Sequence, residues 1–388
     1  MQKILYLTPY LPYPNSRAAN LFISKRISLL AKRFQVHLVS ITNGEKPQHT
    51  ETTSRHPDLT SCKIFTRKNL SLISALQSAI QQEHPFNLLF PEMIEYVKRK
   101  SANFDYILID HSYFAEYVIR KANLHDSKTV VIYHNIEKDY FKYIYHSTSF
   151  KNPKKLYYLL SYLATKKRER ELESYKLNAK WFLSETDYEF VQGGSKLYTP
   201  SIKFTPTLND EEMQITHSIN YFGQLDNDRN IDGLQWFISK VLPLLPKKVV
   251  FQIAGRNPSN RLKQMISTRN NIKLIGEIHD LQTYFSQNKL FIIPLFSTIG
   301  VQTKLFESLS NNALIICTKD VARGTPFKNN QHLLESNEPE EYANLIVHAM
   351  QNFNSLYSKF QKNISEISSN ELSDKQLLTD METNLDKL

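Results

Sequence analysis

The chain has 388 residues, more than a single hydrophobic core comfortably holds, so two domains are expected. Its 41% hydrophobic and 22% charged residues are typical of a globular protein, and no unbroken apolar segment of about eighteen residues is present to span a membrane. The formal net charge of +10 favours an anionic partner, but zinc-finger spacing, RNA-binding signatures and a basic low-complexity tail are lacking, which argues against nucleic acid.

The N-terminus begins with an apolar run, residues 3–7, that is too short for a signal peptide and is followed by Pro9, Pro12 and Pro14. We therefore expect a cytoplasmic protein. Cys62 and Cys317 are far apart and have no metal-like spacing, so we expect two reduced core residues.

The first half of the chain alternates apolar strands with helices. Strands are expected at 3–7, 36–41, 106–110, 129–133 and 180–184, and helices at 18–34 and 151–178. This βαβ order implies a parallel sheet with right-handed crossovers, and the unbroken apolar runs indicate strands that are buried on both faces.

The second half repeats this alternation after a polar stretch at 205–216. Strands are expected at 219–223, 249–255, 272–276, 290–294 and 313–317, a helix at 233–242, and polar helices from Glu340 to the end. The sequence therefore predicts an N-terminal domain at 1–201, a C-terminal domain at 202–365, and a helical tail at 366–388 that packs back on the N-terminal domain.

Several short segments together resemble one enzyme family. In the second half they are residues 221–226 with 230–232, 251–256 and 275–281, and a more specific run from Pro294 through Gly300, Thr303 and Lys304 to Glu307. The first half adds residues 3–14, 104–106 and 133–137. In this order and spacing they resemble the group 1 glycosyltransferases, retaining family four of the GT-B fold, over almost the whole chain.

The resemblance implies an α/β protein of GT-B architecture, with two Rossmann-like, doubly wound parallel-sheet domains facing across a cleft. The N-terminal domain would bind the acceptor and the C-terminal domain the nucleotide-sugar donor. The implied enzyme is a hexosyltransferase that moves a sugar, with retention, from a nucleotide-diphosphate sugar to a glycan or lipid-linked acceptor in cell-surface polysaccharide or glycoconjugate biosynthesis. No cofactor and no metal would be needed.

A diphosphate leaving group requires stabilisation of growing negative charge, which a helix N-terminus and a cation can supply. Residues 300–303 lie between a strand and a helix, so their backbone is expected to face the diphosphate, with Lys304 and Arg229 as cations. Glu307, one turn later, would accept hydrogen bonds from the ribose hydroxyls; the alternative is an ordinary ion pair with Lys304 on an exposed face. The candidate donor-binding residues are Gly223, Gln224, Gly255, Arg256, Gly276, Ile299, Gly300, Val301, Gln302, Thr303 and Glu307.

A second polar cluster is expected at strand ends of the first half. His134 ends an apolar strand and is followed by Asn135 and Glu137, and Asp110 and His111 end another. Ligands of open parallel sheets bind beyond these ends. The resemblance places His134 beside the donor sugar or acceptor, with a purely structural role as the alternative. The catalytic candidates are thus His134, Lys304 and Arg229, and the acceptor-binding candidates are Arg17, His111, Asn135 and Glu137.

The sequence departs from the family pattern at three places. The paired-glycine loop is replaced by residues 15–20, which contain no glycine, and Arg17 is a candidate substitute charge. Ile299 stands where family members have the first of two glutamates, and Gln224 stands where many have an arginine. Two alternatives therefore stay open: a nucleotide-sugar epimerase of the same architecture, and a non-catalytic binding protein derived from a transferase.

Two segments are strongly basic. The first helix carries Lys25, Arg26, Lys32 and Arg33, and the 151–178 segment carries Lys151, Lys154, Lys155, Lys166, Lys167, Arg168 and Arg170 among tyrosines and leucines. Such a helix can lie on anionic lipid or can pack, solvated, on its own domain. Peripheral contact with an anionic membrane at its inner face is therefore an expectation that would suit a lipid-linked acceptor.

Overall fold

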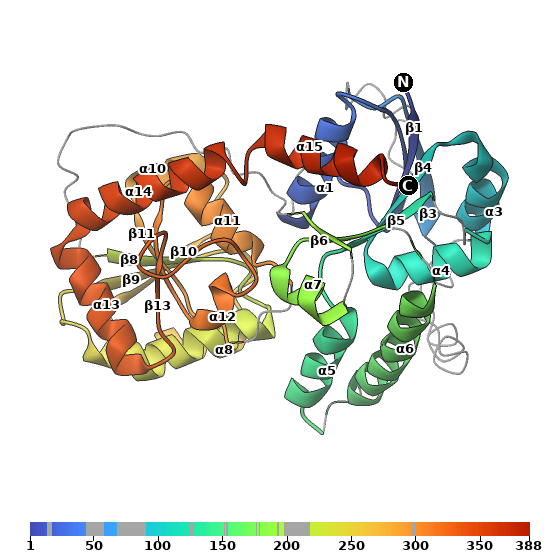
Figure 1. Cartoon of the computed structure of the whole chain (residues 1–388). Helices are drawn as coiled ribbons and strands as arrows, with labels where there is room; N and C mark the ends of the chain where they lie inside the picture. The colour runs from blue at the N-terminus through green and yellow to red at the C-terminus, as the bar shows by residue number, and fades with distance from the viewer. Residues whose placement is uncertain are drawn as a thin grey trace. The chain divides into compact units, whose positions relative to one another are not determined.

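The computed structural model describes most of the chain (Figure 1). The described residues are 1–13, 18–43, 58–67, 91–124, 128–150, 152, 154–175, 177, 179–191, 194–197, 218–296 and 300–388. Two candidate site residues, Arg17 and Ile299, lie outside them, as do the expected boundary near Ile202 and part of the glycine-free segment 15–20.

The chain forms two compact units. The N-terminal unit contains Met1–Pro200, Ile299–Val301 and Asp374–Leu388, and the C-terminal unit contains Ser201–Thr298 and Gln302–Ser373. The expected start of a tail at residue 366 falls inside helix α14 (Phe353–Ser369). Because Phe360 and Ile364 of this helix are buried, the helix continues past that point, and the chain changes unit only at Asp374.

The N-terminal unit is built on a seven-stranded parallel sheet with the order β3-β2-β1-β4-β5-β6-β7. Its strands are β1 (Lys3–Thr8), β2 (Gln35–Asn43), β3 (Ser61–Arg67), β4 (Tyr106–Asp110), β5 (Thr129–Tyr133), β6 (Ala179–Phe182) and β7 (Ser195–Lys196). Every residue of β4 and β5 is buried, as their unbroken apolar runs predict.

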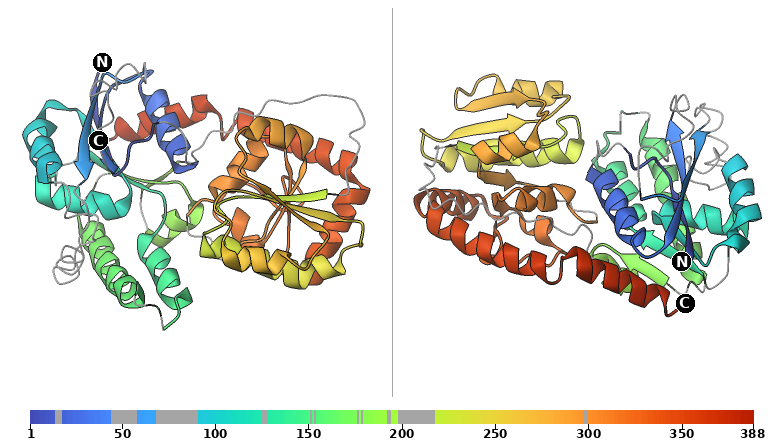
Figure 2. Two further views of the ribbon diagram at one scale, coloured as in Figure 1. Left: turned by 180° about the vertical axis from the view of Figure 1, so that it is seen from behind. Right: turned by 90° about the horizontal axis from the view of Figure 1, so that it is seen from above.

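Helices cover both faces of this sheet (Figure 2). They are α1 (Ala18–Leu30), α3 (Pro91–Lys100), α4 (Ser112–Ala122), α5 (Glu137–Ser147), α6 (Lys154–Ser174), α7 (Glu185–Val191) and α15 (Asp374–Leu385). One core contains Leu5 and Ile109 together with residues of α3 and α4. The other contains Tyr6 and Leu108 together with residues of α1 and α15.

The basic face predicted for the first helix is not a free surface. Lys25 forms an ion pair with Asp374 at 2.5 Å, and Arg33 forms one with Glu382 at 3.2 Å, both on α15. Arg26 is fully buried. Three basic side chains of the predicted first helix are therefore paired or buried. The C-terminal helix supplies two of the carboxylates, which a reading of residues 18–34 alone could not reveal.

The C-terminal unit is built on a six-stranded parallel sheet with the order β10-β9-β8-β11-β12-β13. The strands are β8 (Ser218–Phe222), β9 (Val250–Ala254), β10 (Ile272–Gly276), β11 (Leu290–Ile293), β12 (Leu314–Cys317) and β13 (Leu334–Glu335). The helices are α8 (Asp228–Trp236), which continues as a π-helical turn at Phe237–Val241, α9 (Asn260–Ile266), α10 (Leu281–Gln287), α11 (Thr303–Ser310), α12 (Lys319–Ala322), α13 (Pro339–Gln351) and α14.

The strand order reverses beside the first strand of each sheet, between β1 and β4 and between β8 and β11. In open α/β sheets, ligands bind at the carboxyl ends of the strands near such a reversal. The α/β class with two parallel-sheet domains is thereby confirmed. No helix within the described ranges is both long and apolar enough to cross a membrane.

Candidate functional site

Three glycines lie at the carboxyl ends of neighbouring strands in the C-terminal unit. Gly223, Gly255 and Gly276 have φ values of 155°, 150° and 89°. The Gly223 amide donates to the Ala254 carbonyl at 3.0 Å, and the Gly255 amide donates to the Gly276 carbonyl at 2.7 Å. A Cβ on Gly255 would lie 1.8 Å from the Gly223 carbonyl oxygen. This close backbone approach requires glycine and leaves the strand ends without side chains.

The loop after β8 is held by the start of α8. Asn227 caps this helix, since its Oδ1 accepts the Arg229 amide at 3.1 Å. Asn230 then donates through Nδ2 to the Gln224 carbonyl at 2.8 Å, and the Gln224 side chain is exposed. The Gln224 loop is therefore fixed over the end of β8.

Lys304 reaches the same place from the first turn of α11. Its Nζ donates to the Tyr221 hydroxyl at 2.8 Å and to Asn230 Oδ1 at 3.3 Å, and it lies 4.2 Å from the centroid of the Tyr221 ring. A Cβ on Gly223 would lie 2.7 Å from this Nζ. Lys304 thus occupies the space that Gly223 leaves at the end of β8.

Burial of the ammonium group lowers the pKa of Lys304 to about 7, an effect that Glu307 opposes and Arg229 reinforces. Burial likewise raises the pKa of Glu307, which Lys304 partly offsets. The alternative of an exposed ion pair does not describe this geometry, because Lys304 is directed to Tyr221 and both groups are partly desolvated. A cation and a carboxylate with incomplete pairing suit a polar ligand that carries both phosphate and hydroxyl groups.

The remaining candidates of this unit take different places. Gln302 is the N-cap residue of α11 without a side-chain cap bond, and Thr303 is the first residue of the helix. Arg256 is exposed, and its carbonyl accepts the Leu225 amide at 3.0 Å. The structure brings together Gly223, Gln224, Arg229, Lys304 and Glu307; Tyr221 and Asn230 had not been assigned a site role from sequence.

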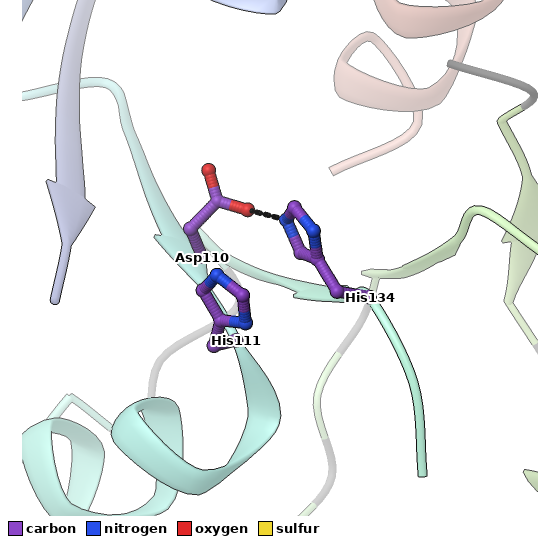
Figure 3. Close-up of side chains that lie close together, drawn as sticks. All are labelled: Asp110, His111 and His134. Atoms are coloured by element: carbon purple, nitrogen blue, oxygen red, sulfur yellow. Dashed lines mark hydrogen bonds and ion pairs between the residues drawn. The ribbon is translucent and has the colours of Figure 1, made fainter. Parts of the chain in front are cut away.

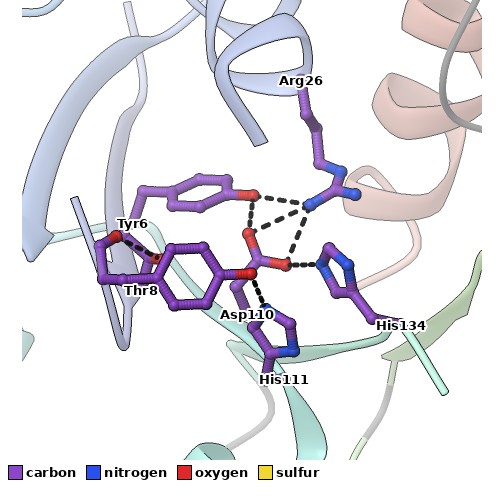
Figure 4. A network of polar contacts seen from close by, with 7 residues as sticks. Tyr6, Thr8, Arg26, Asp110, His111 and His134 are labelled. Carbon is purple, nitrogen blue, oxygen red and sulfur yellow. Dashed lines mark hydrogen bonds and ion pairs between the residues drawn. The ribbon is translucent and has the colours of Figure 1, made fainter. Parts of the chain in front are cut away.

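The N-terminal unit has its own polar cluster around Asp110, at the end of β4 (Figure 3). Asp110 and Arg26 are both 0% exposed. Arg26 Nη1 donates to the two carboxylate oxygens at 3.0 and 3.1 Å and to the Tyr6 hydroxyl at 2.7 Å (Figure 4). Tyr6 donates to Asp110 Oδ2. The Tyr6 hydroxyl thus contacts both members of this buried ion pair.

His134, directly after β5, is bound to this ion pair. Its Nε2 lies 2.5 Å from Asp110 Oδ1. Burial alone would raise the pKa of Asp110, but Arg26 and His134 hold it well below its usual range, so the carboxylate is anionic. An anionic carboxylate accepts the proton on Nε2, which fixes the orientation of the His134 ring and leaves Nδ1 as its other polar atom.

His111 packs on this pair. Its ring is stacked on that of His134 with centroids 4.0 Å apart, and its Nε2 lies 2.5 Å from the Tyr10 hydroxyl. Burial, reinforced by His134, lowers the pKa of His111 well below the usual range, so this ring is neutral. His111 has a φ of 70°, which is uncommon for a residue other than glycine and is often found at functional sites.

Asp110, His111 and His134 each offer one ligand atom, and these atoms lie within 4.8 Å of one another. Asp110 Oδ1, however, already accepts hydrogen bonds from Arg26 and His134. The guanidinium places a positive charge 3.0 Å from this oxygen, where a metal ion would be repelled. The arrangement fits a hydrogen-bonded ion-pair network better than a metal centre, and metal independence stays a prediction.

Two further candidates lie beside His134. Gly300 has a φ of 68°, and a Cβ there would lie 2.2 Å from the His134 carbonyl oxygen and 2.8 Å from the Asn135 Cβ. Val301 packs against the core that includes Tyr6. The predicted loop residues Gly300 and Val301 thus cluster with the N-terminal unit, whereas Lys304 clusters with the C-terminal unit.

Glu137 is the first residue of α5 and is buried. Its amide donates to Glu169 Oε1 at 2.7 Å, so Glu169 caps α5 from the neighbouring helix α6. Burial raises the pKa of Glu169 to about 8. Of the acceptor candidates, His111 and Asn135 lie beside His134, and Glu137 is tied into the start of the following helix.

We compared the chain with known protein families and with curated proteins. Residues 216–352, most of the C-terminal unit, match the family model described as Glycosyl transferases group 1. A relative from Klebsiella pneumoniae, described as an uncharacterized 44.6 kDa protein in the cps region, is 24% identical over 367 residues, which cover 92% of this chain and 93% of the relative.

Solved structures share the fold over the whole length. Anabaena Alr3699/HepE in complex with UDP has a TM-score of 0.65 at 13% identity, with 100% of both chains covered. Sucrose-phosphate synthase from Thermosynechococcus elongatus has a TM-score of 0.65 at 14% identity, with 98% of both chains covered. A mutant of S. aureus TarM in complex with fondaparinux, alpha-GlcNAc-glycerol and UDP has a TM-score of 0.61 at 11% identity, with 99% of this chain and 100% of that chain covered. The chain therefore has the GT-B fold.

Proposed function

We propose that this protein, in which residues 216–352 form a group 1 glycosyltransferase domain, transfers a sugar from a nucleotide-diphosphate sugar to a glycan or lipid-linked acceptor. The observation that carries the proposal is the group of Lys304, Arg229, Glu307 and Gly223 at the strand ends of that domain. Its cations and its carboxylate match the diphosphate and the ribose of one ligand.

The proposed donor chemistry assigns a separate task to each group. Lys304, Arg229 and the amides at the start of α11 would stabilise the charge that grows on the departing diphosphate. Glycine at position 223 lets Lys304 Nζ lie at the end of β8, where the proposed diphosphate would contact it. Glu307 would accept hydrogen bonds from the two ribose hydroxyls. Because HepE is similar in fold and was solved with UDP and with UDP-glucose, we propose a uridine diphosphate sugar as donor.

His134 is proposed to face the reacting sugar with Nδ1, in the orientation that Asp110 fixes through Nε2. His111, Asn135, Arg17 and Glu137 are the proposed acceptor-side residues. Retention of configuration and independence of metal are proposed on the family resemblance. The relative in a cps region favours a role in surface polysaccharide biosynthesis. We place this role at the inner face of the membrane as part of the proposal.

A transfer assay separates this function from its alternatives. With a radiolabelled UDP-sugar alone, we expect little turnover, and on addition of membrane lipid extract or capsular oligosaccharide we expect label in the acceptor together with release of UDP. An epimerase would convert the donor sugar without any acceptor, and a binding protein would do neither; either result contradicts the proposal.

The affinity for UDP is expected to fall as the pH rises above about 7. In the free protein the pKa of Lys304 is about 7, whereas a bound diphosphate favours the charged ammonium and raises that pKa. At a pH above the pKa of free Lys304, binding of UDP is therefore accompanied by uptake of a proton. Because protons become scarcer as the pH rises, the affinity for UDP falls progressively. Titration calorimetry in two buffers of different ionisation enthalpy measures the proton uptake. Lys304→Met should abolish it; equal uptake by both proteins would assign it to another group.

A further inference from the structure

The helical hairpin of α5 and α6 has an unusual charge distribution. Residues 140–168 contain seven Lys and Arg residues and no Asp or Glu. Near the end of α6 this charge is neutralised, because Arg168 is buried and lies 2.6 Å from Glu171, and Lys167 lies 4.0 Å from the same carboxylate. Lys142, Lys154 and Lys166 are exposed, and no ion pair is found for them among the described residues. The exposed lysines are therefore distributed along both helices of the hairpin, from Lys142 on α5 to Lys166 on α6.

The same hairpin exposes large apolar side chains. Phe150 in the turn is 90% exposed, and Leu156 and Leu163 on α6 are 63% and 51% exposed. The two leucines are seven residues apart, which places them on one face of the helix. The buried face of this stretch instead carries Ser161, Ala164 and Thr165. A helix that simply packs on its own domain has the opposite distribution, so the leucine face requires another apolar partner.

The turn holds Phe150 in place. Lys155 Nζ donates to the Thr148 carbonyl at 2.6 Å and lies 3.7 Å from the centroid of the Phe150 ring and 5.0 Å from that of Tyr145. The α5 and α6 helices pack side by side, and their connection lies at the end of the hairpin away from the sheet of the same unit (Figure 1). An aromatic ring with flanking ammonium groups is thus presented at the tip.

We propose that the exposed side of the α5–α6 hairpin docks on a bilayer that contains anionic phospholipid. Phe150, Leu156 and Leu163 enter the boundary between headgroups and acyl chains, and Lys142, Lys154 and Lys166 contact the headgroups; these six residues are called the hairpin patch. Tyr157 and Tyr162, which are partly exposed on the same helix, have the amphipathic rings that suit this depth.

The alternatives explain the hairpin patch less well. A second copy of this chain that bound through the same face would place two sets of lysines against each other. A glycan would pair with the lysines but would not cover two leucines and a phenylalanine. The bilayer matches both the charge and the apolar surface. The inference extends the proposed function, since a lipid-linked acceptor would be held at such a surface.

Sedimentation with vesicles tests the inference. The intact protein should bind vesicles of phosphatidylcholine mixed with phosphatidylglycerol and bind phosphatidylcholine alone weakly. Each lysine near an anionic surface contributes about fivefold to the partition coefficient, so Lys154→Ala with Lys166→Ala should lower it by about 25-fold. Leu156→Gln with Leu163→Gln should also release the protein from mixed vesicles. The matched control, Lys359→Ala with Lys362→Ala on α14, removes the same charge from exposed positions and should bind as the intact protein does.

Equal vesicle binding by all three double variants overturns the inference. An equal loss of binding in the hairpin lysine variant and in the α14 lysine control also overturns it, because net charge alone would then explain the binding. A dimer of the intact protein that dissociates in the leucine variant, with no vesicle binding, would show a self-association face instead. UDP binding is measured on the same samples. Because it depends on Lys304 and not on the hairpin patch, a failure of the donor site and a failure of membrane docking can be told apart.

Discussion

Replacing Lys304 by alanine is expected to lower kcat/KM for the nucleotide sugar by about 10²–10³-fold. Lys304 Nζ is held by Tyr221 and Asn230 at the end of β8, where a departing diphosphate would gain charge. A preorganised cation in a partly desolvated position stabilises that charge more than a solvated one can. Steady-state kinetics with a UDP-sugar and a competent acceptor measure the loss.

The same variant should not lose thermal stability. Burial lowers the pKa of Lys304, so keeping the charged ammonium in the folded protein costs free energy that the unfolded chain does not incur. Removal of the amine relieves this cost, so the free energy of unfolding should not fall. Lys359→Ala, at an exposed site in the same unit, is the control and should leave the kinetics unchanged. A lower melting temperature in proportion to the lost activity would make Lys304 a structural residue and contradict its catalytic assignment.

Asp110→Ala is expected to destabilise the N-terminal unit by about 3–5 kcal/mol, the usual cost of removing one partner of a buried ion pair. Arg26 is fully buried, and its Nη1 lies 3.0 Å from Asp110 Oδ1. Its charge would then lose this anion in a desolvated position. Urea denaturation followed by circular dichroism measures the change.

A triple variant tests the cause of that loss. Arg26→Met, Asp110→Leu and Tyr6→Phe together replace the network by apolar groups, which should recover most of the lost stability. Asp105→Ala is the control, because this carboxylate is exposed and accepts the Lys3 amide at 2.7 Å, so its loss should cost far less. If the triple variant is no more stable than Asp110→Ala, packing rather than the unpaired charge explains the effect.

Strands with unbroken apolar sequences were predictable from the sequence almost to the residue. Tyr106–Asp110 and Thr129–Tyr133 have the expected bounds, and all of their residues are buried. Such strands are buried on both faces, so composition alone identifies them. The strand β3 and the helices α3 and α4 were not predicted. In β3, Lys63 and Thr66 interrupt the apolar pattern at the edge of the sheet, where pairing with β2 decides the structure.

The candidate site was predictable where it depends on chain order, and not where it depends on distant partners. Glycines at strand ends and polar residues at the start of a helix can be found from spacing, which identified Gly223, Lys304 and Glu307. The role of Tyr221 requires its contact with Lys304, which is 83 residues away in sequence. Arg26 was assigned to a basic surface because the Asp110 carboxylate that buries it is 84 residues away. Arg168 was likewise assigned to that surface, yet it is buried near Glu116 and Glu171.

In the proposed function, the C-terminal unit binds a nucleotide diphosphate between Lys304 and Glu307. The most direct test of this binding is a thermal-shift series of the purified protein with UDP, GDP, ADP, CMP and TDP, with Glu307→Ala measured alongside. A ligand at about 100 times its Kd stabilises the fold by about 2.7 kcal/mol. We expect UDP to raise the melting temperature of the intact protein and to leave that of Glu307→Ala unchanged. No shift with any nucleotide, or an equal shift in the variant, would contradict it.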